Sequence, residues 1–151
     1  TSAVRLVGAA DGSLIGELAR DAELSAELAG LPVIDDRRPE SRLLTVGDAV
    51  PAPQLRAALR LLELDPALLG SAATELTVRI HEEYGFMLVS ATPAWEAALG
   101  FFQLDPGEGA AAADARLEDQ VAAIRTLFAT HAEGTVGWLD ARNPGKVYWA
   151  P

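Results

Sequence analysis

Residues 76–89 read LTVRIHEEYGFMLV, and this stretch decides the fold. Apolar and polar side chains alternate from Leu76 to His81, which is the pattern of a half-buried β-strand. Glu82 to Gly85 then supplies a turn, and the apolar run from Phe86 to Val89 carries the chain back. The sequence therefore predicts a β-hairpin here.

Two amphipathic helices are predicted on either side of this hairpin. The first covers residues 51–64 and has an apolar stripe at helical spacing, made of Leu55, Ala58, Leu59 and Leu62. The second covers residues 115–131, with Asp114 as its N-cap and a stripe made of Leu117, Val121, Ile124 and Phe128. Each helix therefore has one apolar face to bury.

The remaining segments are short. Strands are predicted at residues 4–6, 13–18, 95–102, 136–141 and 146–150, a short helix at 19–29, an apolar run at 31–34 and a loop at 106–114. Short strands joined by tight turns favour an antiparallel sheet. The expected fold class is α+β, an antiparallel β-sheet with two main helices packed on one face, in a single domain over residues 1–151.

Composition excludes several classes of function. The chain has no cysteine, so it has neither a disulfide scaffold nor a thiolate metal site. Its formal net charge is -10, which argues against nucleic acid and anionic bilayer surfaces as partners. No run of 18 uncharged apolar residues is present, so the sequence predicts no transmembrane helix.

The sequence carries no pattern typical of a catalyst, a metal site or a cofactor site. His81 and His131 lack ligand spacing and are expected to be structural or surface residues. Asp35 and Asp36 precede two arginines and are expected to form a solvated, self-neutralising loop. Residues 105–109, DPGEG, lack the spaced acidic ligands of a calcium loop.

Aromatic residues gather at the end of the sequence. Residues 136–151, VGWLDARNPGKVYWAP, hold two of the three tryptophans and one of the two tyrosines. On a last strand at 146–150, Val147 and Trp149 would face one way, and Lys146 and Tyr148 the other. A terminal strand is often a sheet edge that can accept a partner's strand, with the aromatics as anchors. The alternative is that these aromatics close the core of a terminal hairpin.

The same stretch resembles the end of the extracytoplasmic domain of the FtsQ/DivIB bacterial cell-division proteins. That family shows a strand ending in Asp-x-Arg, matched by Asp140 and Arg142, then a turn and a final aromatic strand, matched by Tyr148 and Trp149. Other matching motifs follow the family's order along the chain: a DG turn at 11–12, LPVI at 31–34, VGD at 46–48, the hairpin at 76–89, LG at 99–100 and LEDQVAAIR at 117–125. The resemblance covers nearly the whole chain.

The resemblance implies a non-enzymatic divisome scaffold that takes part in septum formation. The chain would be the β domain of such a protein, preceded by a membrane helix and a POTRA domain. The upstream helix would hold it at the extracytoplasmic face of the cell membrane. Its partners would be FtsB/DivIC- and FtsL-like proteins, bound by strand addition to the C-terminal edge. The matching partner-binding positions are Arg142, Asn143, Lys146, Val147, Tyr148 and Trp149. No cofactor or metal is implied.

The sequence departs from the family at two positions. Phe101 follows the LG step where some members have arginine, and Asn143 follows Asp-x-Arg where some have an aromatic residue. Two other functions stay open. One is an extracytoplasmic small-molecule-binding domain or hydrolase, whose acidic pocket would draw on Asp35, Asp36, His81 and Glu82. The other is a structural domain that acts only as a spacer.

Overall fold

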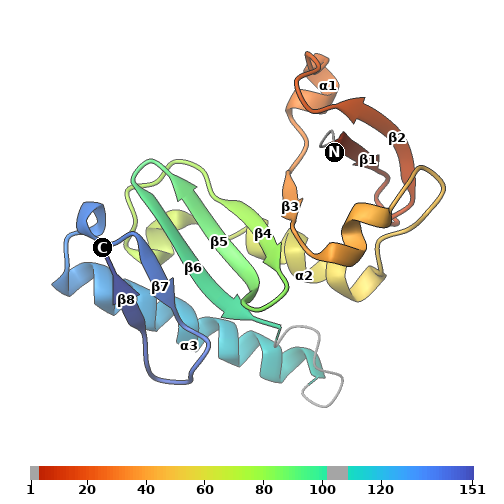
Figure 1. Cartoon of the computed structure of the whole chain (residues 1–151). Helices are drawn as coiled ribbons and strands as arrows, with labels where there is room; N and C mark the ends of the chain where they lie inside the picture. The colour runs from red at the N-terminus through yellow and green to blue at the C-terminus, as the bar shows by residue number, and fades with distance from the viewer. Residues whose placement is uncertain (1–3, 102–108) are drawn as a thin grey trace.

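The computed structural model describes residues 4–101 and 109–151, which form an α+β fold built around a six-stranded sheet (Figure 1). The strand order is β3-β4-β5-β6-β7-β8. The bounds are β3 Ile34–Asp36, β4 Thr77–His81, β5 Gly85–Ala91, β6 Ala94–Gly100, β7 Trp138–Asp140 and β8 Tyr148–Ala150. A separate two-stranded ribbon pairs β1, Val4–Gly8, with β2, Leu14–Ala19.

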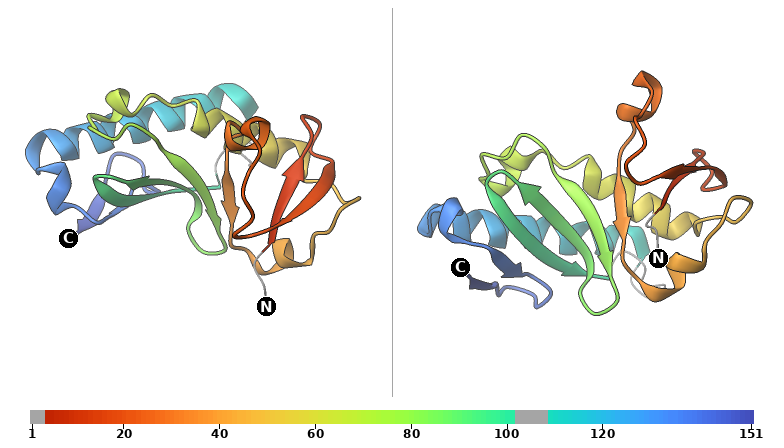
Figure 2. Two further views of the ribbon diagram at one scale, coloured as in Figure 1. Left: turned by 90° about the horizontal axis from the view of Figure 1, so that it is seen from above. Right: turned by 45° about the horizontal axis from the view of Figure 1, so that its top comes forward.

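The two main helices lie on one face of the large sheet, as predicted (Figure 2). They are α2, Ala52–Leu62, and α3, Gly109–Thr130. The other helical segments are α1, Ala26–Ala29, and the 3-10 turns η1, Pro39–Leu43, η2, Pro66–Leu69, and η4, Glu133–Thr135. Among the described residues no helix is both long and apolar enough to cross a bilayer.

The predicted hairpin of residues 76–89 forms the middle of the sheet as β4 and β5. Val78 and Ile80 are 0% and 1% exposed, because these alternate positions on β4 point toward the helices. Gly85 begins β5 with φ +71, and a Cβ there would overlap the backbone of Gly100 on β6. Only glycine fits this position, so the turn that the sequence predicted is also the place where β5 and β6 come closest.

The expectation of a wholly antiparallel sheet is wrong at two pairings, while the α+β class is confirmed. β3 pairs with β4 in parallel, and β6 pairs with β7 in parallel. Each of these pairs is joined through a main helix, α2 in the first case and α3 in the second. A helix returns the chain to the starting end of the sheet, so the strands that flank it run the same way.

Several predicted boundaries are also wrong. The helix expected at 19–29 shrinks to Ala26–Ala29, capped by Ser25, since that stretch offers no apolar face. α3 begins at Gly109, not 115, because the alanine run at 110–113 favours helix, and Asp114 lies inside the helix, paired with Arg60 of α2. Residues 102–108, which hold part of the loop expected at 106–114, lie outside the described residues.

The buried face of α2 is rotated from the expected stripe. Its buried residues are Gln54, Ala57, Ala58 and Leu61, so of the predicted stripe only Ala58 is fully buried. Gln54 is buried although it is polar, because its Nε2 donates to Asp36 Oδ2 of β3 at 3.4 Å. On α3 the expected stripe holds better, with Leu117 and Ile124 buried in the core.

Candidate functional site: an exposed aromatic edge strand

β8 is the outermost strand at one end of the sheet, antiparallel to β7 (Figure 1). The carbonyl of Ala150 accepts a hydrogen bond from Gly137 N at 2.9 Å, so the backbone polar groups of Ala150 face β7. Polar groups of successive strand residues point to opposite sides, which directs the N–H and C=O of Trp149 away from β7. The free edge thus presents one donor and one acceptor at Trp149.

Tyr148 and Trp149 lie on opposite faces of this edge. Trp149 pairs with Leu139, which is fully buried beneath the helices. The ring centre of Trp149 lies 4.5 Å from that of His131, the residue just after α3. Tyr148 pairs with Asp140 and points to the face of the sheet that carries no helix, which we call the open face. Tyr148 and Trp149 are 55% and 39% exposed as residues, so each could bury further area against a partner.

The Asp-x-Arg step fixes the chain where β7 ends. Arg142 donates from Nη2 and Nε to the two carboxylate oxygens of Asp140 at 2.6 and 2.9 Å. These hydrogen bonds lower the pKa of Asp140 and raise that of Arg142. The Arg142 guanidinium also lies 4.9 Å from the ring centre of Tyr84, and its Nη1 donates to the carbonyl of Glu83 at 3.2 Å. The pair thereby links β7 to the turn between β4 and β5.

The structure divides the six predicted partner-binding residues into two groups. Tyr148 and Trp149 lie in β8, whereas Arg142 to Val147 precede it and include a turn in which Lys146 N donates to Asn143 O at 3.1 Å. The strand expected at 146–150 is therefore two residues shorter, because this turn takes up Lys146. Val147 is half-buried against the core cluster.

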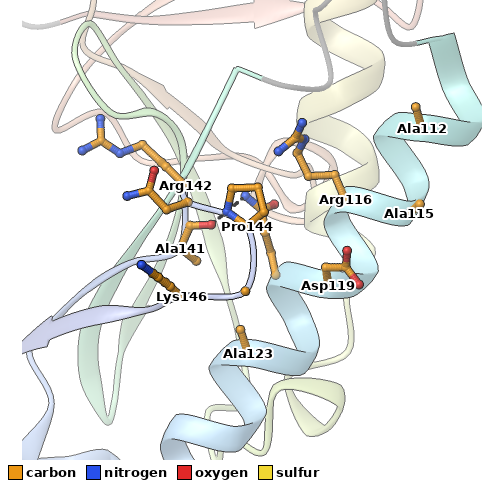
Figure 3. A pocket seen from close by; sticks show the side chains of 12 residues that line it. Ala112, Ala115, Arg116, Asp119, Ala123, Ala141, Arg142, Pro144 and Lys146 are labelled. Carbon is orange, nitrogen blue, oxygen red and sulfur yellow. Dashed lines mark hydrogen bonds between the residues drawn. The ribbon is translucent and has the colours of Figure 1, made fainter.

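Lys146 lies in the turn before β8, so the alternation expected over residues 146–149 does not extend to it. It lines a pocket of about 300 Å³ between α3 and residues 141–146, together with Arg142 and Asn143 (Figure 3). The helix side of this pocket is lined by Ala112, Ala115, Arg116, Asp119, Gln120 and Ala123. Gln120 anchors the loop, because its Nε2 donates to the carbonyls of Leu99 and Ala141 at 2.8 and 3.1 Å.

The two aspartates of the alternative acidic pocket are paired with arginines. Asp35 pairs with Arg37 and Arg79, and Asp36 receives two hydrogen bonds from the Arg38 guanidinium at 2.6 and 2.9 Å. Burial alone would raise the pKa of Asp36, but hydrogen bonds from Arg38 and Ser41 bring it below its ordinary value. The two aspartates lie in β3, so the loop expected there is a strand.

The four residues of that alternative do not line the pocket at α3. His81 uses its Nδ1 as an acceptor for backbone N–H groups of the neighbouring turn, and Nδ1 of His131 lies 3.0 Å from Thr130 Oγ1. Both therefore have structural contacts, as expected. Within residues 4–101 and 109–151 no group of three or more potential ligands could hold a metal ion. The DPGEG segment falls almost wholly outside these ranges.

Trp138 belongs to the aromatic stretch 136–151 that the sequence singled out, but Tyr84 was not expected beside β8. Their ring centres lie 4.8 Å apart in an edge-on arrangement, although 54 positions separate them in the sequence (138 minus 84). Trp138 pairs with Ala150 of β8, which brings this ring pair beside the edge. The sequence feature that could have indicated Tyr84 is its position next to Gly85 in the hairpin turn, from which its side chain can reach the face of the sheet.

No family model, curated protein or solved structure matches the chain. The class of protein is therefore defined by the fold and the site: an α+β domain whose mixed sheet ends in an exposed aromatic strand.

Proposed function

We propose that this domain is a non-enzymatic scaffold that binds a partner protein by adding the partner's strand to β8. The observation that carries the proposal is the edge itself. β8 has two exposed aromatic side chains, no charged side chain, and outward-facing polar groups at Trp149. Added strands gain affinity from main-chain hydrogen bonds and specificity from flanking side chains, and this edge offers both.

The opposite end of the sheet supports this choice of edge by contrast. There the outermost strand is β3, whose Asp35 and Asp36 pair with Arg37 and Arg38. Charged side chains along an edge strand discourage pairing with another chain. Of the two ends of the six-stranded sheet, only the β8 end lacks such protection on the strand itself.

The resemblance to FtsQ/DivIB proteins supplies the proposed partners. They are FtsB/DivIC- and FtsL-like division proteins, met at the extracytoplasmic face of the cell membrane. Asp140 and Arg142 support the resemblance, since their ion pair sets the turn that leads into β8. The function proposed is thus assembly of the division machinery, with Tyr148 and Trp149 as the main anchors.

The experiment is a calorimetric titration of the domain with a peptide from the C-terminal segment of the same organism's FtsB/DivIC-like protein. An added strand long enough to pass Trp149 would take its next hydrogen bond from the N–H of Val147, two residues earlier. Val147→Pro should abolish saturable binding, because proline has no N–H to donate. Val147→Ala is the matched control, since it removes the same half-buried side chain but keeps the N–H. Equal loss in both variants, or binding that survives the proline, would contradict strand addition here.

A further inference from the structure

A turn on the open face connects a titratable side chain with the surface beside β8. His81 ends β4, and its Nδ1 lies 3.1 Å from Glu83 N and 3.4 Å from Tyr84 N. Backbone N–H groups can only donate, so Nδ1 is the acceptor. The imidazole in this arrangement is neutral, with its proton on Nε2.

The same turn supports the groups next to the proposed partner edge. The carbonyl of Glu83 accepts from Arg142 Nη1, and the ring of Tyr84 lies under the Arg142 guanidinium. Tyr84 also contacts His81, with 4.9 Å between ring centres, and the edge-on ring of Trp138. The His81 side chain thus supports the turn that contacts Arg142 and Trp138, together with the backbone pairing of His81 with Gly85 and the hydrogen bond from Gly100 N to the carbonyl of Tyr84 at 3.0 Å.

We infer that His81 is a positioning residue that makes the partner surface depend on pH. When Nδ1 takes up a proton, it can no longer accept from Glu83 and Tyr84, and it becomes a donor that faces two other donors. The turn then loses these two hydrogen bonds, and Tyr84 is held less firmly against Arg142 and Trp138. Imidazole is the side chain whose ordinary titration lies between pH 5 and 8, so this is the pH range over which the turn should be tested.

Three arginines belong to the elements packed around His81. Arg79 lies two residues earlier on the same face of β4, and Arg37, just after β3, donates its N–H to the carbonyl of Ile80. Arg142 approaches from the chain after β7. These arginines already pair with Asp35, Glu96 or Asp140.

The acidic groups of this region are Asp140 and two glutamates of the turn. Glu82 and Glu83 belong to the turn itself, and Glu83 contacts His81 and Arg142 through its backbone. Asp140 is bound by Arg142, which lowers its pKa, so it remains ionised throughout the range in which imidazole titrates. Asp140 therefore does not contribute to a pH response between 5 and 8, which leaves His131, whose ring lies beside Trp149, as the other group to control.

The first test follows the backbone amide resonances of Glu83 and Tyr84 in the isolated domain from pH 8 to pH 5. In the wild type both should shift with the titration of an imidazole, and their hydrogen exchange should accelerate at pH 5. His81→Asn keeps a carbonyl acceptor for the same N–H groups but does not titrate, so its amides should stay constant. His131→Asn is the control, and its Glu83 and Tyr84 amides should titrate as in the wild type. Unmoved wild-type amides, or the same shifts in His81→Asn, would overturn the inference.

The second test measures binding of the FtsB/DivIC-like peptide at pH 8 and pH 5, and this part depends on the proposed function. The wild type should bind about tenfold more weakly at pH 5, the effect of losing one or two neutral hydrogen bonds. In His81→Asn the two affinities should agree within about twofold, whereas His131→Asn, which changes the ring beside Trp149, should keep the wild-type pH dependence. An equal pH dependence in the wild type and in His81→Asn would refute the link from His81 to the partner surface. Absence of binding at pH 8 would refute the proposed function instead, while the amide titration still decides the role of His81.

Discussion

Tyr148 is the side chain whose removal should best separate binding from folding. It is 55% exposed. For an aromatic side chain of about 200 Å² this leaves about 110 Å² for a partner to cover. At about 25 cal/mol per Å², that area corresponds to about 3 kcal/mol, or roughly a hundredfold in affinity. Tyr148→Ala should therefore weaken peptide binding by about two orders of magnitude.

The cost of the same change to the fold should be smaller. The part of the ring already covered is about 90 Å², which sets an upper limit of about 2 kcal/mol on the lost free energy of unfolding. Calorimetric titration gives the affinity, and urea unfolding gives the stability. Ile15→Ala is the control, because Ile15 is 63% exposed on β2, away from the edge, and should leave the affinity unchanged.

Two results would refute this reasoning. If Tyr148→Ala unfolds the domain, the tyrosine belongs to the core of a terminal hairpin, which is the alternative that the sequence left open. If the variant folds and binds as tightly as the wild type, a partner does not cover the open face at Tyr148. A similar loss in Ile15→Ala would show that the peptide binds exposed apolar surface without regard to the edge.

Three further changes test the supports of the edge. Asp140→Asn should lower the free energy of unfolding by about 1 kcal/mol at pH 7. The folded pKa of Asp140 lies below its unfolded value of about 3.9, so the difference from wild type should vanish as pH falls through the folded pKa. Urea unfolding at pH 7 and pH 3 will measure this difference. Gln120→Leu leaves the carbonyls of Leu99 and Ala141 without their donor, but it also removes the unpartnered Oε1. The free energy of unfolding, measured by thermal unfolding, should fall by about 1–3 kcal/mol. An unchanged midpoint would mean that the glutamine does not anchor the loop. Gly85→Ala should cost at least about 3 kcal/mol, since it combines a positive φ with an overlap on Gly100; full stability in the same assay would contradict the close approach of β5 and β6.

Local patterns in the sequence predicted the parts of the fold that depend on neighbouring residues. The alternation from Leu76 to His81 determines which side of β4 is buried, and Gly85 determines where the chain turns. The pairing direction of β3 and β7 could not be read in the same way. A strand has the same period of two whether its neighbour is parallel or antiparallel, so direction depends on which strand the preceding helix returns to.

The candidate site was predictable to a similar extent. Clustering of aromatics near the end of the sequence indicated Tyr148 and Trp149, and the structure leaves both exposed. The contacts of Tyr84 with Trp138 and Arg142 join segments far apart in sequence, and no local pattern encodes them. Lys146 was expected in a strand, but it lies in the turn and lines the pocket at α3, so the alternation expected for a strand does not apply to it.

Hydrogen exchange at the Trp149 amide tests strand addition to β8 most directly. In the free domain this N–H faces outward and should exchange quickly, whereas the N–H groups of Tyr148 and Ala150 face β7 and should be protected. In the complex with the FtsB/DivIC-like peptide, the account predicts that the Trp149 amide becomes protected as strongly as its neighbours. A Trp149 amide that still exchanges quickly in the saturated complex would contradict the account, because the peptide would then be bound without pairing to this edge.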